Sequence, residues 1–101
     1  MTERGEAKRD GAKQQKNSGR GQYQKGDAKW EGFLVDYKES SKSFSINLDV
    51  WSKICTDTFK VDRNLNPALK LIIGNNDKIR LAVIEWSTLE DILNRRKNEN
   101  L

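Results

Sequence analysis

The sequence predicts one α/β domain, in which a mixed central sheet is flanked by helices. Alternating or apolar segments at residues 22–30, 33–39, 68–73 and 79–85 are typical of short strands. Apolar residues recur at helical spacing between residues 48 and 59 and again after residue 87. Because strands and helices are interspersed along the chain, and because 101 residues suffice for one modest core, we expect a single layered domain.

The first third of the chain is expected to form a helix, a loop and a hairpin. Residues 3–16 are rich in helix formers, although Gly5 and Gly11 interrupt them. Residues 17–21 have the composition of a loop. Residues 22–30 and 33–39 then predict two antiparallel strands around a tight turn at Glu31-Gly32.

The remaining elements are predicted from capping residues and turns. Asn47 or Asp49 is expected to cap the second helix, and residues 43–46 are predicted to form a short additional strand. Residues 74–77, Gly-Asn-Asn-Asp, predict a turn between the last two strands. Ser87 and Glu90 have the spacing of a capping box, which predicts the start of the last helix.

The net charge of +4 is concentrated at one end of the chain. Residues 1–29 contain eight basic and four acidic residues, whereas residues 30–101 contain eleven of each sign. Five of the seven glycines also lie in this first segment. We therefore divide the chain into a basic arm with a glycine-rich loop (residues 1–21) and a core (residues 22–101). The arm is expected to contact nucleic acid through phosphate neutralisation, or else to be a solvated tail.

Several kinds of chemistry are excluded by composition. The chain has no histidine and one cysteine, which excludes histidine-based triads and the usual zinc sites. It contains no glycine-rich nucleotide-binding motif. The single cysteine, the absence of a signal peptide and the absence of a long apolar run favour a cytoplasmic protein.

The predicted hairpin brings charged residues together. If Glu31-Gly32 is a two-residue turn, Asp27 lies opposite Asp36, and Lys38 follows two residues later on the same face. Two carboxylates at this distance repel each other unless a cation lies between them, and Mg²⁺ is the hard cation that such oxygens suit. The three residues therefore predict a minimal site for metal-assisted phosphodiester hydrolysis. The other reading is that they form the charged outer face of an ordinary hairpin.

These residues resemble those of a known group of nucleases. Lys25-Gly26-Asp27, followed by Asp36-Tyr37-Lys38 at a strand end and by the Glu39-Ser40 pair, resembles the PD-(D/E)xK nuclease superfamily. The loop at residues 18–21 and a preceding helix with a carboxylate resemble its Holliday-junction resolvases, and in particular the small resolvase-like endonucleases of bacteriophages and prophages. The resemblance implies a restriction-endonuclease-like α-β-β-β-α-β core.

The resemblance also implies a role for each site residue. Asp27, Asp36 and the carbonyl group of Tyr37 would bind Mg²⁺ or Mn²⁺, Lys38 would be the catalytic lysine, and Glu6, or alternatively Glu3, would complete the site. The family cuts branched DNA as homodimers. The DNA-binding residues expected from the resemblance and from the basic segment are Lys13, Lys16, Ser18, Arg20, Lys25 and Lys29.

The function that we expect is a Mg²⁺-dependent endonuclease that acts on branched DNA such as Holliday junctions. The alternative is a non-enzymatic nucleic-acid-binding module with a basic N-terminal arm. A protein-interaction domain whose basic tail is incidental is a third possibility. Trp51 and Cys55 are expected in the core, and Trp30 and Trp86 in the core or in a dimer interface rather than as platforms for stacked bases.

Overall fold

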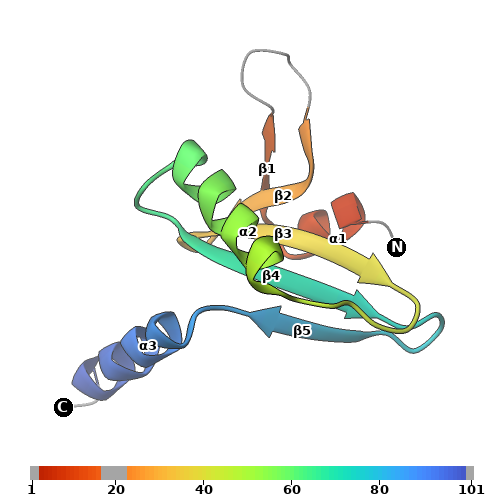
Figure 1. Cartoon of the computed structure of the whole chain (residues 1–101). Helices are drawn as coiled ribbons and strands as arrows, with labels where there is room; N and C mark the ends of the chain where they lie inside the picture. The colour runs from red at the N-terminus through yellow and green to blue at the C-terminus, as the bar shows by residue number, and fades with distance from the viewer. Residues whose placement is uncertain (1–2, 17–22, 100–101) are drawn as a thin grey trace.

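A computed structural model describes the backbone of residues 3–16 and 23–99, and the side chains of residues 5–13 and 28–99 within these ranges. The elements are α1 (Glu3–Arg9), β1 (Lys13–Lys16), β2 (Tyr23–Trp30), β3 (Phe33–Ser40), α2 (Leu48–Val61), β4 (Asn66–Ile73), β5 (Ile79–Val83) and α3 (Trp86–Glu99). Figure 1 shows that α2 lies across the sheet, whereas α3 extends away from it.

The five strands form one mixed sheet in the order β1-β2-β3-β4-β5. β3 and β4 are parallel, and the other neighbouring pairs are antiparallel. A parallel pair needs a crossover connection, which α2 provides between β3 and β4. The predicted α/β class with a mixed sheet is confirmed.

The first helix is shorter than the sequence predicted. It ends at Arg9, and Gly11 follows with a φ angle of 73°. The Gly11 N–H donates to the Lys8 carbonyl group and the Ala12 N–H donates to the Ala7 carbonyl group, which is the Schellman arrangement that ends a helix. The chain then turns into β1, so a helix that continues to residue 16 is wrong.

Residues 3–16 pack against the rest of the described fold, whereas the predicted boundary at residue 21 lies outside the described residues. β1 pairs with β2, and Ala7 of α1 is 1% exposed within the main core. Residues 3–16 therefore pack as part of the same sheet and core as the later strands.

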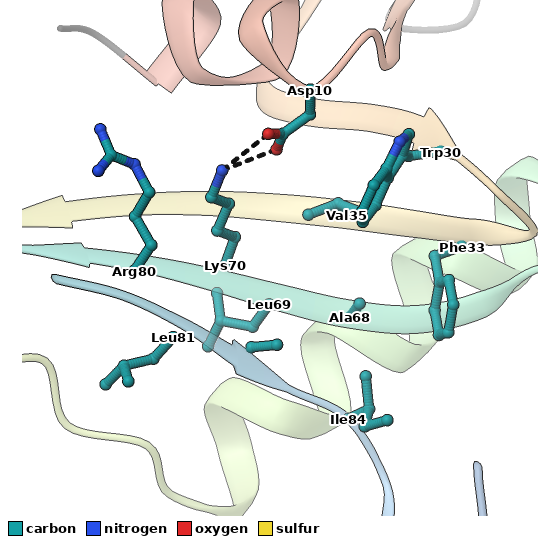
Figure 2. Close-up of a pocket in the computed structure, with 11 residues that line it drawn as sticks. Asp10, Trp30, Phe33, Val35, Ala68, Leu69, Lys70, Arg80, Leu81 and Ile84 are labelled. Carbon is teal, nitrogen blue, oxygen red and sulfur yellow. Dashed lines mark hydrogen bonds and ion pairs between the residues drawn. The ribbon is translucent and has the colours of Figure 1, made fainter. Parts of the chain in front are cut away.

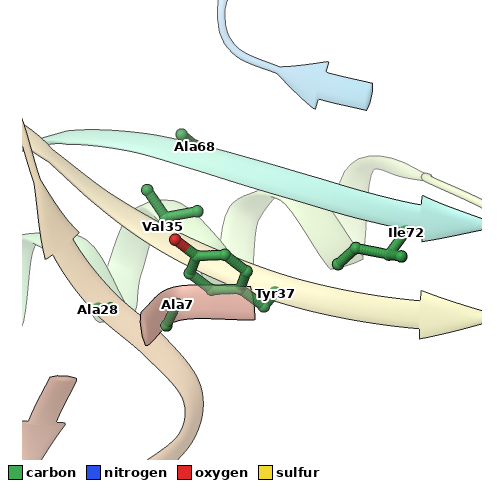
Figure 3. Packing of buried hydrophobic residues seen from close by; sticks show 6 residues of the cluster. All are labelled: Ala7, Ala28, Val35, Tyr37, Ala68 and Ile72. Atoms are coloured by element: carbon green, nitrogen blue, oxygen red, sulfur yellow. The ribbon is translucent and has the colours of Figure 1, made fainter. Parts of the chain in front are cut away.

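The sheet has a different apolar cluster on each face. The first face carries Ala28, Val35, Tyr37, Ala68 and Ile72, which pack with Ala7 of α1 (Figure 3). The second face carries Leu69 and Leu71, which pack with Ile54 of α2. We call these the α1 face and the α2 face of the sheet.

Two further expectations are wrong and one is refined. Residues 43–46 form no strand, although Phe44 packs against the α2-face cluster. The last helix begins at Trp86 rather than at Ser87, because the Glu85 carbonyl group accepts its first backbone hydrogen bonds. Asn47 is the residue that caps α2, with its side-chain oxygen 2.9 Å from the Val50 nitrogen.

Candidate functional site

The hairpin that carries the predicted site has the predicted register. Trp30 pairs with Phe33, and three residues further along each strand Asp27 pairs with Asp36. The tight turn is possible because Glu31 and Gly32 both have positive φ angles, 49° and 84°. The two aspartates are therefore directly opposed on neighbouring strands. The side chain of Asp27 lies outside the described residues.

Asp36 and Lys38 meet on the α2 face of the sheet. The Lys38 Nζ atom lies 3.5 Å from the Asp36 Oδ1 atom. The Asp36 side chain is 18% exposed and the Lys38 side chain is 38% exposed. This contact follows from the strand, since residues i and i+2 project to the same face.

A further carboxylate, that of Asp57, lines a cavity next to Asp36. A small cavity of about 10 Å³ between β3 and α2 is lined by Leu34, Asp36, Ile54, Asp57 and Thr58. This volume is near the lower limit for a single water molecule. Asp57 thus lies across a water-sized space from Asp36.

Asp57 was not among the predicted site residues, although the sequence contains a signal for it. The buried residues of α2 are Ile54 and Thr58, which are one helical turn apart. Asp57 lies on the same side of the helix, three residues after Ile54. Helical periodicity could therefore have placed it against the sheet, but not opposite Asp36.

Glu6 is not brought together with this pair in the described structure. It is completely buried, and its Oε1 atom accepts a hydrogen bond of 2.6 Å from Arg80 Nε on β5. Its helix packs on the α1 face, whereas Asp36 lies under α2. The expectation that Glu6 completes the site is corrected accordingly. The side chain of Glu3, the alternative, lies outside the described residues.

The α1 face carries a second charged group that sequence reasoning missed. The Lys70 Nζ atom lies 2.8 Å from Asp10 Oδ2, and the Tyr37 hydroxyl group donates to the same oxygen at 3.0 Å. Burial raises the pKa of the Tyr37 phenol, and the hydrogen bond to Asp10 and the charges of Asp10 and Glu6 raise it further. This group ties α1 to the sheet. No sequence pattern predicted it, because its members are up to 60 residues apart.

Two of the predicted DNA-binding lysines are neighbours in the sheet. Lys13 of β1 pairs with Lys29 of β2. Lys29 also pairs with Leu34, so by strand alternation it lies on the α2 face with Asp36. Ser18 and Arg20 lie outside the described residues, as do the side chains of Lys16 and Lys25.

Cys55 does not have the environment of a reactive thiol. Burial raises the pKa of its thiol, and the charge of Glu85 and a hydrogen bond to it raise it further. Trp51 and Cys55 are both partly buried rather than fully in the core. Trp30 and Trp86 are exposed to 43% and 74%, respectively.

Within residues 3–16 and 23–99, and apart from the undescribed side chains, no group of three or more Asp, Glu or Cys residues is arranged to hold a metal ion. No helix among the described residues is long and apolar enough to cross a bilayer.

Comparisons with protein-family models, with curated proteins and with solved structures found no match to this chain.

Proposed function

We propose that the protein is a metal-dependent endonuclease that hydrolyses phosphodiester bonds in DNA, with branched DNA as its substrate. The observation that carries this proposal is the convergence of Asp36 and Lys38 on one face of β3, with Asp27 directly opposed to Asp36 in the register. The order of the first six elements, α-β-β-β-α-β, supports a restriction-endonuclease-like core as part of the same proposal.

The donor groups suit a hard divalent cation. Asp36 and Asp57 both line a water-sized cavity, and Asp27 is opposed to Asp36 on the neighbouring strand. Carboxylate oxygens, together with water and phosphate oxygens, are what Mg²⁺ and Mn²⁺ prefer. When bound, such a cation would lower the pKa of a water molecule and stabilise negative charge on the phosphate group.

Residues of the chain itself would stabilise charge on the phosphate group and bind the DNA backbone. Lys38 is a half-exposed cation next to Asp36, so it is placed to stabilise charge that develops on a phosphate oxygen. Lys29 lies on the same face, near the pair, and would bind a neighbouring phosphate group. Asp36 holds the Lys38 ammonium group in position through their 3.5 Å contact.

The test is cleavage of a fixed four-way DNA junction in Mg²⁺ by the full chain and by two variants, Asp36→Asn and Lys38→Met. We expect both variants to lose at least about 100-fold in rate, because electrostatic and acid-base groups each contribute on this order. Asp49→Asn and Lys53→Met, which change exposed residues of α2, are the matched controls and should cut like the parent. Full activity of either site variant would overturn the assignment.

A second readout separates metal binding from catalysis. A ligand that binds only the folded state raises the melting temperature, and the rise grows with the ligand concentration relative to its Kd. Mg²⁺ or Mn²⁺ should therefore raise the melting temperature of the parent, and Asp36→Asn should abolish the rise while Asp49→Asn retains it.

The alternative function, a nucleic-acid-binding module without activity, is favoured by the paired lysines Lys13 and Lys29 and by the basic N-terminal segment. It predicts binding that weakens steeply with salt, no metal-dependent stabilisation, and no cleavage product in any divalent ion.

A further inference from the structure

The α1 face of the sheet contains an apolar groove that α1 does not fill. A cavity of about 300 Å³ lies over β3, β4 and β5. Its apolar walls are Trp30, Phe33, Val35, Ala68, Ala82 and Ile84. Figure 2 shows the Asp10–Lys70 pair and Arg80 at one side of this groove, and Trp30 and Phe33 at the other.

The chain also contains a helix that makes no extensive contact with any other described element. None of the described residues of α3 is buried. Trp86, Leu89 and Leu93 nevertheless form an apolar stripe, since their spacing of three and four residues places them on one side of a helix. Trp86 is 74% exposed and Leu93 is 46% exposed. A helix of 14 residues is marginal in water by itself, so α3 needs a surface to pack against.

The residue before α3 is bonded to α2, which covers the face of the sheet opposite the groove. Glu85 Oε1 accepts hydrogen bonds from Trp51 Nε1 at 3.4 Å and from Cys55 Sγ at 3.8 Å, both on α2. Because α2 covers the opposite face, these contacts direct α3 away from the groove. The connection from β5 consists only of Ile84 and Glu85. While Glu85 keeps its contacts with α2, this connection is too short for α3 to pass around the sheet edge to the groove.

We propose that α3 of one copy packs into the groove of a second copy, and that the exchange is reciprocal, giving a two-fold symmetric dimer. The apolar stripe of α3 would then cover the apolar walls of the partner's groove. The charges are compatible: Glu90, four residues after Trp86, flanks the stripe on α3, and the groove is flanked by Arg80, which bonds Glu6 through Nε and whose side chain is 32% exposed. This inference does not depend on the proposed nuclease activity.

The first test is the oligomeric state of the full chain, measured by sedimentation over a range of concentrations. We expect a dimer, and about 10- to 100-fold weaker association for Leu93→Asp on the helix and for Ala82→Arg in the groove. Both positions are exposed in the single copy, so neither variant should unfold it. The matched control is Asn98→Asp, which adds the same charge at an exposed position on the opposite side of α3 from the stripe and should leave the dimer intact.

The decisive test mixes the two variants. A mixed dimer of Leu93→Asp and Ala82→Arg has one contact with both changes and one contact with neither. We therefore expect the mixture to associate more strongly than either variant alone. A parent that stays monomeric, or a mixture that associates no better than its components, would overturn the proposal, as would association that appears only when DNA is added.

Discussion

Arg80 Nε donates a hydrogen bond of 2.6 Å to Glu6 Oε1 and so joins β5 to α1 across 74 residues of sequence. Glu6 is completely buried, while the Arg80 side chain is 32% exposed. A buried carboxylate is tolerated only when a cation or hydrogen bonds compensate its lost hydration. Arg80 provides the closer compensating cation, while Arg9 Nη1 lies 3.9 Å from Glu6 Oε2, and the contact with Arg80 fixes the position of α1 on the sheet.

Replacing only one member of this pair should be costly. We expect Arg80→Met to lower the free energy of unfolding by about 3 kcal/mol, since it removes the closer cation and leaves the buried carboxylate with only the exposed Arg9, 3.9 Å away. The double variant Arg80→Met with Glu6→Leu should recover much of that loss, because it removes the buried charge as well. Urea denaturation of the two variants and the parent measures this, and equal destabilisation of both would contradict the role assigned to the pair.

Tyr37 should make stability fall at high pH. Burial and the neighbouring Asp10 raise the pKa of its phenol above the ordinary 10.0, so the unfolded chain loses this proton before the folded chain does. The contribution of Tyr37 is therefore complete below pH 10 and is lost as the pH rises further. Below pH 10, Tyr37→Phe should cost about 1–2 kcal/mol through the lost hydrogen bond to Asp10.

The difference in the free energy of unfolding between Tyr37→Phe and the parent should then become smaller above pH 10. The measurement is urea denaturation at intervals between pH 8 and pH 11, a range that brackets the ordinary phenol pKa of about 10. A gap that stays constant over this interval would show that the phenol is not held in its neutral form by the fold.

Gly74 should be the least replaceable of the described turn glycines. Its φ angle is 125°, and an added Cβ atom would lie 2.7 Å from the Asp77 carbonyl oxygen. Gly74→Ala should cost more than about 2 kcal/mol, since both strain and a backbone clash apply. Gly32→Ala is the control: its φ angle is 84°, but no atom lies within 4 Å of the added Cβ, so only the backbone strain remains. Thermal unfolding of the two variants should rank them in this order.

Asp57 provides a prediction that the hairpin alone does not. If Asp36 and Asp57 share a bound cation, Asp57→Asn should lower the apparent affinity for Mg²⁺ by about tenfold. The affinity is measured from the Mg²⁺ concentration needed to raise the melting temperature. Asp91→Asn, on the exposed side of α3, is the matched control. An unchanged metal response in Asp57→Asn would limit the metal site to the hairpin.

The hairpin register was predictable because it depends on local rules. A two-residue turn with positive φ angles fixes which residues face each other, and strand alternation then sorts their side chains. Asp27 opposite Asp36, and Lys38 beside Asp36, follow from counting outward from Glu31-Gly32. The cap at Asn47 was predictable for the same reason, since an asparagine before a helical apolar pattern satisfies nearby N–H groups.

The site and the core also contain arrangements that local sequence rules do not predict. Asp57 lines the same small cavity as Asp36 only because α2 crosses the sheet between β3 and β4. The helix composition of residues 3–16 was overruled at Gly11, where the chain could gain strand pairing with β2 instead of another helical turn.

The sequence by itself determined the α/β class, the hairpin register and the pairing of acidic and basic residues on β2 and β3, because turn geometry and strand alternation act over a few residues. Only the tertiary structure decided that Glu6 faces Arg80 rather than Asp36, that Asp57 lines the same cavity as Asp36, and that α3 leaves its apolar stripe uncovered. These arrangements depend on how separate elements bury their surfaces against one another, and that choice is made by the packing of the whole chain.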